Sequence, residues 1–241
     1  MPPHISLISL NVEHSKHLDA IKAFLERETP DVFCAQEILD CDIPFFEKIA
    51  GPLVCFAPML MLSREPKPVF WGVAIFSQLP VRAYEATYYH GDKNHIRMYD
   101  KKNPSAASRV FLCADIEKDA SIFRIGTTHF TWTSDGQADD AQRRDLNALF
   151  RALDTAGGIA LTGDFNAPRG WEIFSALSER FKDNIPPRYD TSIEGSPHRN
   201  SIKRMVDGLF TTPAYEARDV DMVSGVSDHY AIRALIRKGI V

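Results

Sequence analysis

Apolar, strand-like runs follow one another through most of the chain, and their order limits the fold more than any other feature. The chain begins with "HISLISLNV", an amphipathic helical pattern over residues 15–30, and "DVFCAQEI", which together predict a β-α-β unit with neighbouring parallel strands. Five more strand-like runs follow in succession, at residues 53–60, 69–77, 81–89, 107–117 and 122–132. This succession predicts antiparallel, meander-like pairing in the middle of the chain.

Helical and strand-like patterns alternate again in the last part of the chain. Residues 135–153 predict an amphipathic helix with Leu146, Leu149, Phe150 and Leu153 on one face. A strand over 157–165, a short helix over 171–181 and strands over 204–212 and 227–236 complete the pattern. No repeat or long linker divides the chain, so we expect a single α/β domain over residues 1–241, built as a sandwich of two packed sheets. The irregular segments 90–108 and 183–203 are expected to be functional or mobile loops.

Composition excludes few functions. Hydrophobic residues make up 44% and charged residues 25% of the chain, which is typical of a soluble globular protein. The net charge of −4 gives no general attraction to nucleic acid, so a polyanion would need a local basic patch. The four cysteines lack C-x-x-C spacing, which disfavours zinc sites and disulfide frameworks. Without an apolar run of about 18 residues or a leader pattern, the expectation is a reduced, cytoplasmic monomer with no transmembrane segment.

Polar residues end several of the predicted strands. "GGIALTGDFNAP" ends with Asp164 and Asn166 on either side of Phe165. In an extended chain, alternate side chains point the same way, so Asp164 and Asn166 should share one side while Phe165 packs into the core. Other polar residues at or near strand ends are Asn11, Gln36, Glu37, His129, Asp207, Asp228 and His229.

Each of these residues has a simpler explanation when it is taken alone. Asn11 could cap a helix, Glu37 could be solvated, Asp228 could bond its own turn, and His129 could be a core histidine. Carboxylates beside buried strands are nevertheless costly unless they are paired or bind a metal. Carboxylate and amide oxygens without a thiolate favour Mg²⁺, with Mn²⁺ as a substitute, and histidines provide proton transfer and hydrogen bonding. The set predicts a hydrolytic metal site.

The same residues carry a family resemblance. "SLNV", "AQE", "TTHF", "TGDFNAP", "VDGLF" and "SDHYAI" occur in this order, and the chain resembles the endonuclease/exonuclease/phosphatase superfamily from about residue 5 to 236. The superfamily includes deoxyribonucleases, abasic-site endonucleases, deadenylases, sphingomyelinases, inositol polyphosphate 5-phosphatases and tyrosyl-DNA phosphodiesterases. The resemblance implies a four-layer α/β sandwich, two packed mixed β-sheets flanked by helices, and metal-dependent hydrolysis of phosphoric esters.

The resemblance also implies metal-binding and water-positioning residues. Glu37 would be the principal Mg²⁺ ligand, helped by Asn11. Asp164 would orient or deprotonate the attacking water, and Asn166 would hold that water or a phosphate oxygen.

The remaining motif residues would act on the phosphate. His229 would stabilise the charge that develops on the scissile phosphate, and Asp207 would accept the other ring N–H of His229. Asp228 would bind a metal at a second position, and His129 would contact the phosphate.

The sequence leaves the substrate open. Candidate substrate-binding residues are Arg97, Tyr99, Arg143, Arg169 and Arg204, and further basic residues in the same segments are Lys93, Lys101, Lys102, Arg144, Arg188, Arg199 and Lys203. Each basic residue could equally be an ordinary solvated charge. The first hypothesis is therefore a nuclease, either endonuclease or exonuclease, that acts on DNA or RNA. The second is a phosphatase or phosphodiesterase of a small or lipid-linked ester, such as an inositol phosphate or sphingomyelin. The third is a non-catalytic metal- or phosphate-binding module.

Overall fold

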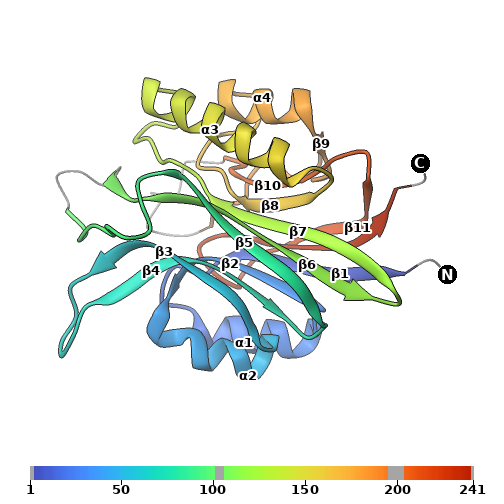
Figure 1. Ribbon diagram of the computed structural model, residues 1–241, viewed down its shortest axis with the longest axis horizontal. Helices are drawn as coiled ribbons and strands as arrows, with labels where there is room; N and C mark the ends of the chain where they lie inside the picture. The colour runs from blue at the N-terminus through green and yellow to red at the C-terminus, as the bar shows by residue number, and fades with distance from the viewer. Residues whose placement is uncertain (1–2, 101–105, 195–203, 240–241) are drawn as a thin grey trace.

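Two six-stranded β-sheets pack face to face between two pairs of helices in the computed structural model, which describes residues 3–100, 106–194 and 204–239 (Figure 1). The first sheet has the strand order β11-β12-β1-β2-β4-β3. Its strands are β1 His4–Asn11, β2 Val32–Leu39, β3 Leu53–Leu62, β4 Val69–Ser77, β11 Tyr215–Val223 and β12 Ala231–Lys238. In this sheet β1 and β2 are parallel and flank α1 in the chain, which confirms the predicted β-α-β unit.

The second sheet has the strand order β5-β6-β7-β8-β10-β9. Its strands are β5 Val81–His90, β6 Arg109–Lys118, β7 Ser121–His129, β8 Ala160–Asp164, β9 Lys182–Asp183 and β10 Asp207–Thr211. The predicted meander is antiparallel, but the chain changes sheets between β4 and β5. Both sheets are mixed, because β7 and β8 are also parallel to each other. The predicted α/β sandwich of two packed mixed sheets flanked by helices is confirmed.

The helices cover the outer faces of the two sheets. They are α1 Leu18–Glu28, α2 Ile43–Ala50, α3 Asp140–Ala156 and α4 Glu172–Arg180, with a short 3₁₀ turn, η1, at Asp40–Asp42. Helices α1 and α2 lie against the first sheet, and α3 and α4 against the second (Figure 1). Within the described chain, no helix is long and apolar enough to span a membrane.

The apolar side chains form three layers that follow from strand alternation. In β2, Val32 and Cys34 face the core between the sheets, whereas Phe33 and Ala35 face the helices. A strand that is buried on both faces reads as a continuous apolar run, as the sequence of β2 does. The two sheets are therefore held by one shared core and by two helix-facing cores.

Local sequence sets the ends of α3. Asp139 accepts a hydrogen bond from the backbone N–H of Gln142 at 2.7 Å, so α3 begins after residue 139 and not at the predicted residue 135. At its other end Gly157 has a φ of +73°, a conformation that favours glycine, and its N–H bonds the Leu153 carbonyl.

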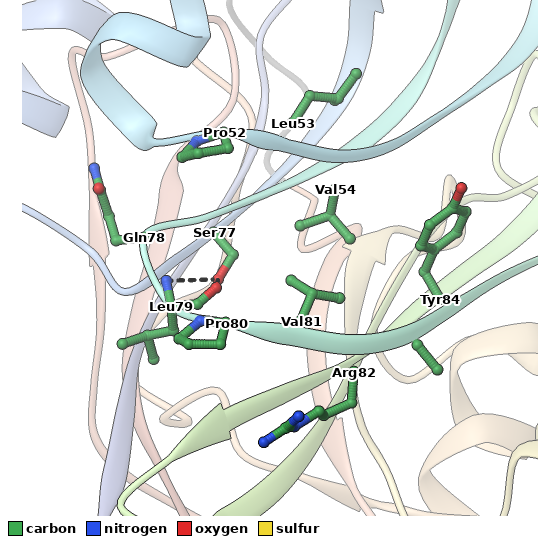
Figure 2. A pocket seen from close by; sticks show the side chains of 11 residues that line it. Pro52, Leu53, Val54, Ser77, Gln78, Leu79, Pro80, Val81, Arg82 and Tyr84 are labelled. Carbon is green, nitrogen blue, oxygen red and sulfur yellow. Dashed lines mark hydrogen bonds between the residues drawn. The ribbon is translucent and has the colours of Figure 1, made fainter.

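A pocket of about 640 Å³ opens between the first residues of β3 and β5 (Figure 2). Its walls are mainly apolar, with Leu53, Val54 and Val81, and the Leu79 N–H donates to Ser77 Oγ at 3.0 Å. The described lining contains no Asp, Glu or His. It also lies at the far end of β4 from Trp71, which contacts one of the predicted site histidines. The predicted polar residues therefore meet elsewhere.

Candidate active site

Strand pairing brings the predicted polar residues to one edge of both sheets. In the second sheet, Asp164 at the end of β8 lies beside His129 at the end of β7 and opposite Asp207 at the start of β10. In the first sheet, Asn11 ends β1 beside Gln36 of β2. The sheets face each other, so polar residues from both meet at this edge.

Asp164 contacts residues from both sheets. Its Oδ2 accepts a hydrogen bond from Asn11 Nδ2 at 3.1 Å and lies 3.4 Å from His129 Nε2 and 3.9 Å from His229 Nε2. Its Oδ1 accepts from the Asn166 backbone N–H at 2.8 Å. Burial raises the pKa of the Asp164 carboxyl, but the bond to His129 and the charges of His229 and His129 outweigh burial and hold that pKa well below its usual value. Asp164 is therefore an ionised carboxylate in a buried position.

His229 and Asp207 form a buried pair beside Asp164. The Nδ1 atom of His229 lies 2.7 Å from Asp207 Oδ2, which is the contact that the family resemblance implies. Burial opposes the positive charge of His229, yet the carboxylates of Asp207, Asp164 and Asp228 raise its pKa well above the usual 6.5. His229 is therefore positioned as an imidazolium whose Nε2 faces the Asp164 side of the site.

An irregular backbone places Glu37. The pairing of β2 with β4 shifts register between Ala35 and Ile38, and Glu37 has a φ of +58°, which is uncommon for a residue with a side chain. Glu37 Oε1 lies 3.8 Å from His129 Nε2, and Oε2 lies 3.7 Å from His14 Nε2. The bulge directs the Glu37 carboxylate to the site. Residues in uncommon backbone conformations cluster at the functional sites of proteins.

The segment after β1 adds Glu13 and His17, which were not predicted as site residues, beside the predicted Asp228. Glu13, His17 and Asp228 place one ligand atom each within 4.8 Å of one another. Glu13 is also paired with Lys16, and His17 Nε2 lies 2.7 Å from Glu13 Oε2. The run "NVEHSKH", dense in Glu and His directly after Asn11, is the sequence signal that could have located them. Asp228 thus belongs to a group whose other members come from the beginning of the chain.

A second compact group consists of Asp164, Asp207 and His229, whose ligand atoms also lie within 4.8 Å of one another. All three side chains are buried, and two of the three offer carboxylate oxygens. The two carboxylates are compatible with a divalent cation, and His229 could join them as a ligand only in its neutral form. The site therefore contains residues that could hold a metal ion. These donors alone do not determine which ion binds.

The chain turns after Asp164, so the expected alternation ends there. Asn166 has a φ of +50°, and its Nδ2 donates to the Phe130 carbonyl at 3.0 Å. Asn166 therefore holds the backbone beside the site instead of continuing an extended strand. Phe165 is fully buried against Phe174 and Phe210, as expected for the core residue between the two polar ones.

Three of the predicted substrate-binding arginines have partners within the chain. Arg143 bonds Glu172 through two nitrogens, at 2.7 and 2.9 Å. Arg169 is paired with Asp183 at 2.8 Å. Arg204 stacks over Trp171 at 4.8 Å and bonds a backbone carbonyl. The carboxylate partners of Arg143 and Arg169 reduce the positive charge that is free to bind a substrate, whereas the contacts of Arg204 orient its guanidinium without neutralising it.

The other two predicted substrate-binding residues lie in a loop beside β3. Arg97 and Tyr99 are exposed, and their backbones bond Met61, which lies near the end of β3. Met61 pairs with Phe70 of β4, next to Trp71, whose ring centroid is 5.2 Å from that of His129. The loop is thus near the site edge of the first sheet. Lys101, Lys102, Arg199 and Lys203 lie outside the described residues.

Comparison with known proteins agrees with this arrangement. The profile of the Endonuclease/Exonuclease/phosphatase family matches residues 8–229. The chain belongs to this family. No curated protein sequence matches it significantly.

Solved structures of the family share the fold. The endonuclease/exonuclease/phosphatase from Bacteroides vulgatus is 13% identical with a TM-score of 0.74, covering 98% of this chain and 99% of its own. The mannosyl-6-phosphatase of Bacteroides thetaiotaomicron is 10% identical with a TM-score of 0.69, covering 96% and 99%. The human Nocturnin catalytic domain, with bound sulfate, is 15% identical with a TM-score of 0.67, covering 98% and 94%. These identities are low, so the likeness shows the fold.

Family membership gives the general activity. The family consists of metal-dependent phosphoesterases, and the buried Asp/His group that such enzymes use is present here. The protein is a phosphoester hydrolase of this family.

Proposed function

We propose that the protein is a Mg²⁺-dependent phosphodiesterase that acts on DNA or RNA. The observation that carries this proposal is the buried carboxyl group of Asp164, which contacts Asn11 and lies within 4 Å of both site histidines. A carboxylate in this position can orient or deprotonate a water molecule for in-line attack on phosphorus. The reaction is hydrolysis, so the attacking oxygen comes from water and the leaving oxygen departs with one substrate fragment.

His229 and His129 are assigned to the phosphate. With Asp207 at 2.7 Å from its Nδ1, His229 presents its Nε2 as a charged donor towards the non-bridging oxygens. Fixed donors of this kind stabilise the negative charge that develops in the transition state. His129 would contact the same phosphate from the β7 side.

The metal is assigned to the carboxylates of the site. Glu37, helped by Asn11, would hold Mg²⁺ at the principal position, and Asp228 would bind at a second position. When it is bound, the ion supplies positive charge beside the phosphoryl oxygens and so offsets the developing negative charge. Mn²⁺ has the same preference for oxygen ligands and is expected to substitute.

A small or lipid-linked phosphate ester is the second candidate substrate class. It is favoured by the carboxylate partners of Arg143 and Arg169 within the chain, which leave less free positive charge than a nucleic-acid groove usually has. One structure with the same fold is a mannosyl-6-phosphatase.

A substrate panel tests both candidates. Single- and double-stranded DNA, RNA, abasic DNA, sphingomyelin and inositol phosphates are incubated with the protein and Mg²⁺, with EDTA and Asp164→Ala as controls. The proposal expects cleavage of a nucleic acid that needs Mg²⁺ and Asp164. Cleavage confined to the lipid or inositol phosphates would establish the second candidate, and the absence of all hydrolysis would refute catalysis.

A further inference from the structure

The main chain that carries His129 is held by side chains from β6, from the turn after β8 and from α3. Each carbonyl of residues 129–131 accepts a hydrogen bond from a different side chain. These bonds run from Arg109 Nη1 to His129 O at 3.2 Å, from Asn166 Nδ2 to Phe130 O at 3.0 Å, and from Gln142 Nε2 to Thr131 O at 2.6 Å. The backbone that leaves β7 is therefore fixed at three successive residues.

Helix α3 contributes two polar side chains to this arrangement. Gln142 bonds the carbonyl of Thr131, and Asp145 accepts from the hydroxyl of the same residue and lies 3.0 Å from His90 Nδ1. Gln142 is fully buried and Asp145 is 3% exposed. They are three residues apart, so both lie on the buried face of α3 that continues with Leu149. The buried face of α3 is therefore apolar over most of its length and polar at the end near the site, where Gln142 and Asp145 lie.

The imidazole of His129 depends on this backbone for its orientation. A functional histidine is usually oriented by a hydrogen bond on the ring nitrogen that faces away from the reaction. In the described part of the chain, the buried Nδ1 of His129 has no hydrogen-bond partner. The other restraints on the ring are the edge-to-face contact with Trp71 at 5.2 Å, the contact of Nε2 with Asp164 and the fixed backbone. With these restraints Nε2 lies 3.4 Å from Asp164 and 3.8 Å from Glu37.

We propose that Gln142 and Asp145 are positioning residues that hold the His129 imidazole in the site through the backbone of Thr131. The inference rests on the proposed role of His129 at the phosphate. Neither residue touches the Asp164 group itself, and neither belongs to a sequence motif of the site. Their removal displaces His129 while leaving Asp164, Asp207 and His229 in place.

A double-mutant cycle tests this inference. Gln142→Met keeps the length of the side chain and removes the amide donor, and Asn147→Ala on the exposed face of α3 is the matched control. We expect Gln142→Met to lower kcat about tenfold with KM nearly unchanged, because small displacements of a catalytic group have effects of this size or larger. In a His129→Ala background the same substitution should change kcat by less than about twofold, because there is no imidazole left to position.

The outcomes separate the inference from the proposed function. An equal loss of kcat in the presence and absence of His129, or no loss in a folded Gln142→Met protein, would overturn the inference. If Gln142→Met does not fold, Asp145→Asn enters the same cycle. Absence of hydrolysis by the unmodified protein would count against the proposed function. In that case the NMR resonances of the His129 ring, compared between Gln142→Met and Asn147→Ala, decide the inference. A shift confined to Gln142→Met supports it, and equal spectra refute it.

Discussion

Asp207→Asn isolates the contribution of the charge beside His229. The bond between His229 Nδ1 and Asp207 Oδ2 is 2.7 Å long, and the two residues are 5% and 3% exposed. Asparagine keeps the shape of the side chain and can still accept through its amide oxygen, but it carries no charge. A hydrogen bond to a charged group contributes about 1.5–3 kcal/mol, so kcat should fall about 10- to 100-fold.

The same substitution should move the pH profile. Carboxylates raise the pKa of His229 well above 6.5, so activity that needs the imidazolium is retained through neutral pH and is lost as pH rises through the raised pKa. Removal of the Asp207 charge lowers that pKa. The alkaline decline of kcat should therefore occur at a lower pH in Asp207→Asn than in the unmodified protein.

Steady-state hydrolysis of a chromogenic phosphodiester, measured from pH 6 to 10 at fixed Mg²⁺, checks both expectations. Asp115→Asn is the matched control, because Asp115 pairs with Arg124 through two bonds of 2.7 and 2.8 Å within β6 and β7. The reasoning is refuted if Asp207→Asn retains kcat within about twofold and shows an unchanged alkaline decline.

Three further predictions concern stability, substrate and metal. Phe165→Ala should lower the free energy of unfolding by about 3–5 kcal/mol in urea titrations, because the side chain is fully buried; a loss below about 1 kcal/mol would contradict this packing. Arg97→Ala should raise KM for DNA or RNA, whereas Arg143→Ala should leave it within about twofold because its guanidinium is bound to Glu172; the opposite order would reject these assignments. Glu37→Gln should weaken Mg²⁺ binding in calorimetry more than His229→Gln does; equal weakening would favour the Asp164–Asp207–His229 group as the principal metal site.

The strand ends could be predicted because buried strands have a clear sequence pattern. The apolar run at 69–77 coincides with β4 Val69–Ser77, and Asn11, His129 and Asp164 each end a strand. A buried strand that ends in a polar residue places that residue at a sheet edge. The pairing of strands then brings together residues that are far apart in the sequence.

Other features depend on tertiary structure and have no local pattern. The bulge that directs Glu37 arises from its pairing with β4, and the turn at Asn166 from a left-handed backbone. Helix α2 and strands β9 and β11 were not predicted; α2 spans only eight residues and begins with a proline in its first turn.

Helix α3 shows a different limit of the sequence pattern. Its apolar face was identified from Leu146, Leu149, Phe150 and Leu153, and the polar residues on that face were passed over. A buried position for a polar residue is set by its partner, and the partner Thr131 lies in another element.

The most direct test of the account is the Mg²⁺-dependent hydrolysis rate of Asp164→Asn. The substitution keeps the size of the side chain and its place at the end of β8, so circular dichroism should remain that of a folded protein, while the melting temperature falls because the buried His229 loses a neighbouring charge. A positioned general base contributes about 10²- to 10⁴-fold, so kcat should fall by that factor. A folded Asp164→Asn protein that hydrolyses the substrate within a few-fold of the normal rate would contradict the central claim that Asp164 positions the attacking water.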